Sequence, residues 1–460
     1  MSYFDEADPA RIEREYPYRP EALGAYSASL TEARLRALRS ERLERVLERA
    51  WAVPFYRERF EAHGVMREDV RGIEDLTLLP TYTKRDLMAS VEAHPPWGNF
   101  HGTNEDGAPA AHTVFHTTSG TTGAPQPIYY GAFDREVQNA LLARTYLMQG
   151  IRDDDVVHSV YGFGTINGGH YVREAVLHFT RARLISAGTG VDTPSSQQIA
   201  LMHRFGATVL VGFGDYLSRL AHAAREAGLE PGRDICLRLI SGHLDHGARE
   251  DLEQGWGGAR AYDWYGVGDS GVIAAEGPDR EGLYLYEDAH IVEVVDPDTG
   301  EPAAQGEPGN LCVTVLFKDT VYPVVRFDTQ DVVRLLPGRG PALPAFRRIG
   351  GFEGRSDNMV KLRGINVYPT AIGTWLSSTP GFTGEYVCRV RRIAGRDEMS
   401  VVAEWAGEPQ TRASAQIGLE RQLRERLGVN VAVEVVGPGD TRALTGLEQR
   451  QKPIRLIDER

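Results

Sequence analysis

The sequence predicts an α/β protein with a large N-terminal domain of parallel sheets, flanking helices and a β-rich subdomain, followed by a small α+β C-terminal domain. Its 460 residues exceed what one hydrophobic core usually supports. From Arg152, apolar strand patterns alternate with helical ones, as in βαβ units whose parallel sheet is covered on both faces. Short strands and turns then replace this alternation up to Gly354. We therefore predict domains at residues 1–355 and 358–460.

The N-terminal part is expected to contain one long helix. The chain up to about Ala28 is polar and contains prolines, which favours a strap or a partly mobile arm. The segment Ser29–Glu32 has the pattern of a capping box, and apolar residues then recur at helical spacing until Pro54, which should end or kink the helix. The βαβ region is predicted to contain strands Val156–Val160, Ala207–Gly212, Cys236–Ser241 and Ala261–Tyr265 and helices Ser195–Phe205, Asp215–Ala227 and Arg249–Gln254.

The second half of the chain first becomes β-rich and then α+β. Turn-separated strands predict the β-rich subdomain at His290–Asp296, Asn310–Leu316 and Asp331–Leu336. The C-terminal domain is expected to end in the tail Leu447–Arg460. Before that tail we predict strands Glu385–Val390, Met399–Trp405 and Asn430–Val436 and helices Thr370–Ser378 and Ala413–Leu427.

Composition limits the class of protein. The contents of 42% hydrophobic and 25% charged residues are typical of globular proteins, and the net charge of -13 disfavours nucleic acid as a partner. No apolar run reaches membrane-spanning length, and the acidic start Met1–Glu15 is not a signal peptide. Cys236, Cys312 and Cys388 lie in apolar surroundings and are predicted to be buried free thiols. We expect a cytoplasmic protein without a membrane partner.

The segment from His116 to Pro125 is the strongest local motif. Glycines allow backbone N–H groups to converge on phosphate oxygens, and Ser and Thr hydroxyls add donors. No lysine follows the second glycine, so this is not the P-loop of nucleotide triphosphatases. Taken alone, a polar surface turn explains the pattern equally well. The candidate phosphate-binding residues are Ser119, Gly120, Thr121, Thr122 and Gly123.

Further motifs recur in a fixed order along the chain. They are Tyr265–Asp269 after a strand, Pro323–Asp331, Gly354–Met359, Arg363–Pro369 and Lys452–Asp458. With the phosphate-binding segment and the earlier pieces Pro54–Arg57 and Leu79–Lys84, the chain from about Leu30 onward resembles the phenylacetate–CoA ligase branch of the AMP-forming acyl-CoA synthetase and adenylation-domain superfamily. The resemblance implies a two-step reaction: ATP and an aromatic or arylacetic acid give an acyl-adenylate and pyrophosphate, and the thiol of coenzyme A then displaces AMP.

The resemblance also implies roles for nucleotide-binding residues. The Ser119–Gly123 loop would close over the β- and γ-phosphates. Lys452, which would otherwise count as an ordinary solvated lysine, would bridge the carboxylate and the α-phosphate as a catalytic point charge. Asp331 would accept from the ribose hydroxyls, helped by Arg355. The adenine would stack on Tyr265, with Ser241, Gly242 and His243 at its edge, and Gly266 is a further candidate cofactor-binding residue.

Residues for the acid and for the second step follow from the same resemblance. Asp357 matches the hinge about which the mobile C-terminal domain turns. That turn would bring a loop containing Arg363 and Gly364 to the site for thiolysis. His170 would stand beside the carboxylate, although a structural histidine explains it about as well. The acyl pocket would be lined by Tyr161, Phe163, Gly164, Asn167, Gly169 and Val267.

Several departures from the family pattern leave alternatives open. A hydroxyl residue and Glu usually follow the Tyr-Gly pair, but here Gly268 and Asp269 do, and Asp269 is expected to support Mg²⁺. Ala124 replaces the lysine common after the phosphate loop, and His243 replaces an acid beside adenine. The stretches that carry zinc-associated cysteines in many relatives have none here, so we predict no zinc. Relatives are often dimers, so a homodimer is expected.

Two other functions remain compatible with these residues. One is an adenylating enzyme of specialised metabolism that uses an amine or a carrier-protein thiol as acceptor, or that activates an oxyanion such as nitrite. The other is a non-catalytic relative that binds nucleotide. Full-length resemblance and the retained Lys452 favour the CoA ligase over both.

Overall fold

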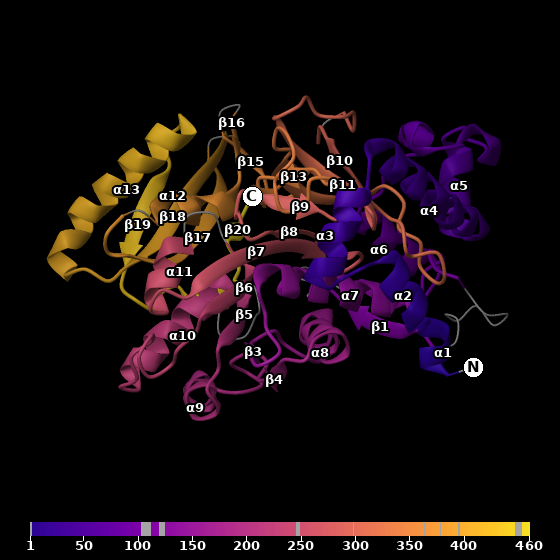
Figure 1. The fold of residues 1–460 in the computed structure, drawn as a ribbon. Coiled ribbons are helices and arrows are strands. Elements are labelled where there is room, and N and C mark those ends of the chain that lie inside the picture. Colours follow the sequence, from indigo (N-terminus) through magenta and orange to yellow (C-terminus); the bar gives the residue numbers. More distant parts are fainter. Residues whose placement is uncertain are drawn as a thin grey trace. The chain divides into compact units, whose positions relative to one another are not determined.

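The computed structural model describes residues 2–102, 112–118, 125–244, 249–297, 299–362, 365–377, 379–393, 396–446 and 453–460. Figure 1 labels their helices and strands along the chain. Their contacts define two compact units. The first unit contains Met1–Ser186 and Tyr262–Gly351, and the second contains Ala187–Ala261 and Phe352–Arg460. The domain boundaries expected at residues 355 and 358 stay a prediction.

The first unit begins with three short helices where the sequence favoured a strap. A capping box formed by Ser2 and Asp5 starts the first, and prolines occupy the opening turns of the next two, where their missing N–H is not needed. Ser29 ends the third helix, so the predicted capping box is wrong; Thr31 caps the long helix by accepting from the Arg34 N–H. The helices are α1 (Tyr3–Ala7), α2 (Pro9–Glu15), α3 (Pro20–Ser29), α4 (Glu32–Ala52), α5 (Pro54–Ala62) and α6 (Lys84–Ala93).

The centre of the first unit is a buried helix, α7 (Ala132–Gln149), which packs against α8 (Asn167–Phe179). Strands β3 (Val156–Ser159) and β4 (Arg183–Ser186) pair in parallel, and α8 lies against both. Other strands of this unit pair antiparallel: β1 (Val114–Thr117) with β2 (Pro127–Tyr130), and β7 (Arg260–Val267), β8 (Gly271–Glu276), β9 (Leu283–Leu285) and β13 (Arg348–Ile349) in succession.

The β-rich part of the first unit is an antiparallel meander of β10 (His290–Val295), β11 (Pro308–Val315) and β12 (Phe327–Arg334). Strand β12 begins at Phe327 rather than at Asp331. Asp331 therefore lies inside a strand instead of opening one, which matters for the candidate site.

The second unit contains a parallel pair and a C-terminal α+β sheet. Strand β5 (Val209–Phe213) pairs in parallel with β6 (Leu239–His243), and α10 (Gly214–Glu226) packs against β5 and against the helices α9 (Ser195–Phe205) and α11 (Arg249–Gly255). The C-terminal sheet has the order β19-β18-β17-β20. Its strands are β17 (Phe382–Ile393), β18 (Arg396–Trp405), β19 (Ala432–Val436) and β20 (Leu456–Asp458), and the smaller elements are β14 (Gly354–Arg355), β15 (Val360–Leu362), β16 (Ile365–Val367), α12 (Ile372–Leu376), α13 (Arg412–Leu427) and α14 (Arg442–Thr445).

Helix α13 covers the C-terminal sheet and closes a second core (Figure 1). Its buried Leu419 and Leu423 pack in one cluster with Val401 and Val433. The parallel pairs, the β-rich part and this α+β sheet together confirm the predicted fold class. None of the helices within the described ranges is both long and apolar enough to cross a membrane.

The cysteine prediction is correct for two residues and wrong for the third. Cys312 and Cys388 are buried free thiols, but Cys236 is exposed. Strand β6 begins only at Leu239, so Cys236 lies in the loop before it rather than in a buried strand.

Candidate functional site

The two residues proposed for adenosine recognition in the first unit contact each other. The Tyr265 hydroxyl at the end of β7 donates to Asp331 Oδ2 at 2.8 Å, and both side chains are buried. A bulge in β12 positions Asp331: the pairing with β11 shifts register between Asn310 and Cys312, and Gln330 adopts a positive φ of 59°. Bulges re-aim side chains at functional sites. The bulge accompanies the contact of the Asp331 carboxylate with the Tyr265 hydroxyl, and the ribose role of Asp331 stays a prediction.

Gly266, beside Tyr265, is required by close packing of the backbone. A Cβ at this position would lie 2.3 Å from the Gly271 carbonyl oxygen on the neighbouring strand, at an irregularity in the β7–β8 pairing. Gly266 therefore allows β7 and β8 to approach closely beside the residue predicted to stack on adenine. Val267 ends the same strand.

Asp269 lies in the turn between β7 and β8 and is fully buried in a polar network. Its Oδ1 accepts from Gln126 Nε2 at 2.7 Å and from the Tyr322 hydroxyl at 2.9 Å. The Lys318 ammonium donates to the Asp269 carbonyl at 2.9 Å. Burial raises the pKa of Asp269 while Lys318 opposes that rise, and burial lowers the pKa of Lys318 to about 8. Sequence reasoning missed these three partners.

The described residues contain no group of three or more His, Cys, Asp or Glu side chains placed to hold a metal ion. The expectation that Asp269 supports Mg²⁺ stays a prediction: this ion is commonly held by one or two carboxylates together with substrate phosphates and water, and Asp269 Oδ1 already accepts from Gln126 and Tyr322. Gly268, which precedes it, has no room for a longer side chain unless a neighbour moves: a Cβ would lie 2.7 Å from Ile128 Cδ1.

The predicted acyl-pocket residues of α8 and the preceding loop lie together. His170 Nε2 contacts the Gly164 carbonyl at 2.9 Å, and the Phe163 ring meets the His170 ring edge-on at 5.2 Å. Gly169 is needed because a Cβ there would lie 2.7 Å from the Gly162 carbonyl. The Tyr161 ring packs near Trp264 instead.

Arg135, which the sequence did not single out, and His116, the first residue of the predicted phosphate-binding segment, extend this cluster. The fully buried Arg135 donates from Nη1 to Asn167 Oδ1 and from Nε to Glu174 at 2.6 Å. The His116 ring lies 5.4 Å from the His170 ring, and burial, with help from the Arg135 charge, lowers the pKa of His116 to about 4. The Asn167 side chain is therefore held by a buried cation. A charged residue is ordinarily expected to be exposed, and only the tertiary partners of Arg135 reveal its burial.

Lys84 is a further cation that the sequence left without a role. Its Nζ donates to Thr118 Oγ1 at 3.0 Å, directly before the predicted phosphate-binding loop. The loop itself, Ser119, Gly120, Thr121, Thr122 and Gly123, lies outside the described residues, as do Arg363, Gly364 and Lys452. Their roles stay predictions.

The second unit holds the remaining candidates. His243 ends β6 and stacks on the Phe213 ring at 4.7 Å, and buried Ser241 lies two residues earlier. Gly242 is fixed by packing, since a Cβ would lie 1.7 Å from the Gly212 carbonyl oxygen. Arg355 forms a two-bonded ion pair with Asp357, with both nitrogen–oxygen distances 2.8 Å. The ribose role of Arg355 and the hinge role of Asp357 stay predictions.

Comparison with known proteins places the chain in a family. The profile of AMP-binding enzymes matches residues 37–315, and that of the AMP-binding enzyme C-terminal domain matches residues 364–460. The phenylacetate–coenzyme A ligase of Thermus thermophilus is 30% identical over 94% of this chain and 98% of the relative. The ligase of the same name from Pseudomonas putida is 31% identical over 92% of this chain and 94% of the relative.

A solved structure agrees with these matches. A 2-hydroxyisobutyryl-CoA ligase, solved with 2-HIB-AMP in the postadenylation state, is 25% identical with a TM-score of 0.81, covering 94% of this chain and 91% of that one. The family match spans more than half of the chain and is joined by near-full-length relatives. The chain therefore belongs to the AMP-binding enzyme family, and its curated relatives are phenylacetate–coenzyme A ligases.

Proposed function

We propose that this protein activates an aromatic or arylacetic acid with ATP and transfers the acyl group to coenzyme A. The names of the curated relatives support the reaction and the substrate class. The observation that carries the proposal is the hydrogen bond between Tyr265 and Asp331, because it joins a stacking ring to a carboxylate able to accept from a ribose. No nucleic acid or membrane takes part, and a homodimer remains our expectation.

The first step forms a phosphorus–oxygen bond. A carboxylate oxygen of the acid attacks the α-phosphorus of ATP, and pyrophosphate leaves with its electron pair. This step gathers negative charge, so it needs fixed dipoles and cations. Lys452 would neutralise charge between the carboxylate and the α-phosphate, and the Ser119–Gly123 loop would hold the β- and γ-phosphates. Asp269 would hold Mg²⁺, which supplies positive charge beside the phosphates when it is bound.

The second step replaces an oxygen–acyl bond with a sulfur–acyl bond. The coenzyme A thiol, after losing its proton to water, attacks the acyl carbon, and AMP leaves with the electron pair of the broken bond. We assign residues 358–460 to a domain that turns about Asp357 and brings Arg363 and Gly364 to this step. The cluster of Phe163, Gly164 and His170 supports an acyl pocket with aromatic walls.

One feature favours a second candidate, an adenylating enzyme that uses an amine or a carrier-protein thiol in place of coenzyme A, or that activates an oxyanion such as nitrite in place of the carboxylic acid. Family members usually place a hydroxyl where Gly268 stands, and Ile128 fills the space beside this glycine. The surroundings of the triphosphate therefore differ from those of a standard CoA ligase.

Product analysis distinguishes these functions. The protein is incubated with ATP, Mg²⁺ and a panel of aryl and arylacetic acids, with and without coenzyme A, and products are identified by mass spectrometry. We expect AMP and an acyl-CoA thioester that forms only with coenzyme A. AMP formation that depends on an amine or on nitrite instead would support the second candidate. The Lys452→Ala variant should lose AMP formation, whereas ATP binding without turnover by the wild type would indicate a non-catalytic relative.

A further inference from the structure

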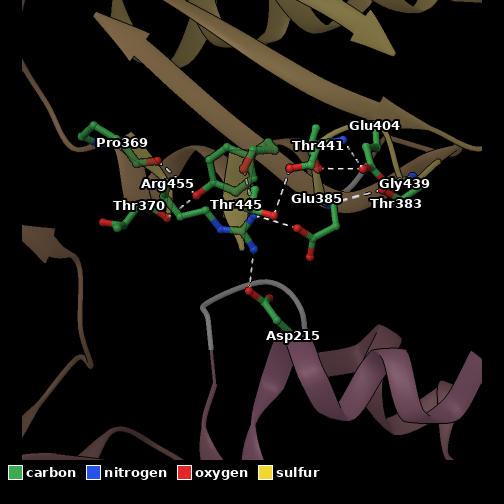
Figure 2. Close-up of polar contacts among 11 residues, drawn as sticks. Asp215, Pro369, Thr370, Thr383, Glu385, Glu404, Gly439, Thr441, Thr445 and Arg455 are labelled. Carbon is green, nitrogen blue, oxygen red and sulfur yellow. Dashed lines mark hydrogen bonds and ion pairs between the residues drawn. The ribbon is translucent and has the colours of Figure 1, made fainter. Parts of the chain in front are cut away.

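Arg455 lies at a junction of three segments of the second unit (Figure 2). Its Nη2 pairs with Asp215 Oδ2 at 2.5 Å, and its Nη1 pairs with Glu385 Oε2 at 3.1 Å. The same Nη1 donates to the Tyr386 carbonyl at 2.9 Å, and the guanidinium lies 4.5 Å from the centre of the Tyr386 ring. The Arg455 side chain is 9% exposed, so one largely buried cation faces two carboxylates.

The partners of Arg455 differ in where they come from. Glu385 and Tyr386 lie on β17, and β17 pairs with β20, which starts directly after Arg455; Cys388 N donates to the Arg455 carbonyl at 2.9 Å. These contacts are internal to the C-terminal sheet. Asp215 instead lies in the first turn of α10, within the segment that the sequence assigns to the large N-terminal domain. The Asp215–Arg455 pair thus joins the two domains predicted to turn relative to each other.

Asp215 stands at a functional edge of the second unit. It follows Phe213, the last residue of β5, and Phe213 pairs with His243 at the end of the parallel strand β6. Ligands of open α/β sheets bind beyond the carboxyl ends of parallel strands. Lys452 precedes Arg455 by three residues in the sequence, a stretch that spans at most about 11 Å. An arginine fastened at this edge therefore limits how far the predicted catalytic lysine can depart from it.

The pair is also built to open. When Asp215 moves away, Arg455 keeps Glu385 and the Tyr386 carbonyl, so no unpaired cation is left in the C-terminal sheet. Asp215 is 25% exposed already and can be solvated fully. Opening therefore breaks one partly exposed ion pair without leaving a buried charge unpaired, which is the costly case.

We propose that the Asp215–Arg455 ion pair is a latch that positions the C-terminal tail for adenylation and opens for thioester formation. Arg455 is in this view a positioning residue, and the proposal rests on the proposed function. Loss of the pair removes support from one of two domain orientations, so it shifts their populations. The adenylation half-reaction should slow, and the thiol half-reaction should not.

The test uses the full-length Asp215→Asn variant, which keeps the shape of the side chain and removes its charge. Adenylation is followed by pyrophosphate–ATP exchange, and thioester formation is followed from supplied acyl-adenylate and coenzyme A. We expect exchange to fall about fivefold or more at saturating ATP, with the KM for ATP within twofold, while thioester formation is unchanged or faster. Asp215→Glu, which keeps the carboxylate, should restore most of the exchange rate.

The matched control is Asp397→Asn. Asp397 pairs with Arg392 at 2.9 Å and with Arg460 at 2.7 Å, so its ion pairs stay within the C-terminal sheet. This variant should leave the ratio of the two half-reactions unchanged. A second readout needs no activity: hydrogen–deuterium exchange of residues 453–460 should be faster in Asp215→Asn than in the wild type.

The outcomes separate the two levels of the proposal. Equal changes in both half-reactions, or no change in either, would overturn the latch while leaving the CoA ligase intact. Unchanged hydrogen exchange in residues 453–460 would likewise overturn it, since the pair would not fasten the tail. A wild type that forms no adenylate from any acid would instead overturn the proposed function, and the assigned role of Arg455 with it.

Discussion

Substituting Tyr265 by Phe tests the candidate nucleotide site with the smallest change. The ring that would stack on adenine stays, and only the hydroxyl that donates to Asp331 Oδ2 at 2.8 Å is lost. Both side chains are buried, so water cannot readily replace the donor. A hydrogen bond to a charged group is worth about 1.5–3 kcal/mol, which corresponds to roughly 10- to 150-fold in an equilibrium constant.

Part of this free energy is lost in the unbound protein as well, so the lower end of the range is expected in binding. We expect the Kd for AMP, measured by calorimetry, to rise about 10-fold in Tyr265→Phe, with a parallel loss in kcat/KM for ATP. Tyr286→Phe is the control, because it also removes a buried hydroxyl of the first unit, one that bonds to Thr145 and not to a predicted ligand residue. An AMP Kd within twofold of the wild type would refute the inference that the Tyr265 hydroxyl orients Asp331 for ribose.

Three further predictions concern stability and are tested by measuring Tm, the midpoint of thermal unfolding. Arg144 and Asp288 form two hydrogen bonds of 3.0 Å, and both side chains are fully buried. Arg144→Met should therefore lower the free energy of unfolding by about 3–5 kcal/mol and lower Tm, and adding Asp288→Leu should recover part of that free energy. An unchanged Tm in Arg144→Met would contradict this prediction. Gly242→Ala should lower Tm and soluble yield, because its Cβ would lie 1.7 Å from the Gly212 carbonyl oxygen. A variant as stable as the wild type would show that β5 and β6 can move apart enough to hold the methyl group. Burial lowers the pKa of His290 from 6.5 to about 4, so the contribution of the neutral ring to stability is present above pH 6.5 and is lost as the pH falls towards 4. The His290→Gln variant should therefore show a smaller fall of Tm between pH 7 and pH 4.5 than the wild type. Equal slopes of Tm against pH in the two proteins would argue against this prediction.

Periodic patterns in the sequence predicted the elements that carry their own signal. Helix α9 begins and ends where the pattern indicated, at Ser195 and Phe205, because a regular apolar face needs no tertiary information. The N-terminal helices were missed for the opposite reason. They are short and largely polar, and caps such as Ser2 with Asp5, rather than an apolar stripe, define them.

The candidate site was only partly predictable, for a physical reason that Asp331 illustrates. Its motif predicted the residue, but the strand starts at Phe327 and the bulge that turns the carboxylate depends on a partner strand. Arg135 and Lys318 were missed because a charged residue in a sequence ordinarily implies solvent. Their burial is decided by Glu174 and Asp269, which lie far away along the chain.

The exposed thiol of Cys236 gives the protein a natural attachment point for a probe. The chain has three cysteines, and the other two, Cys312 and Cys388, are buried. Burial also raises the pKa of both, which keeps them protonated and slow to react with maleimides. A single dye can therefore be coupled to the unmodified protein, so fluorescence experiments on the catalytic cycle can begin without first removing any cysteine.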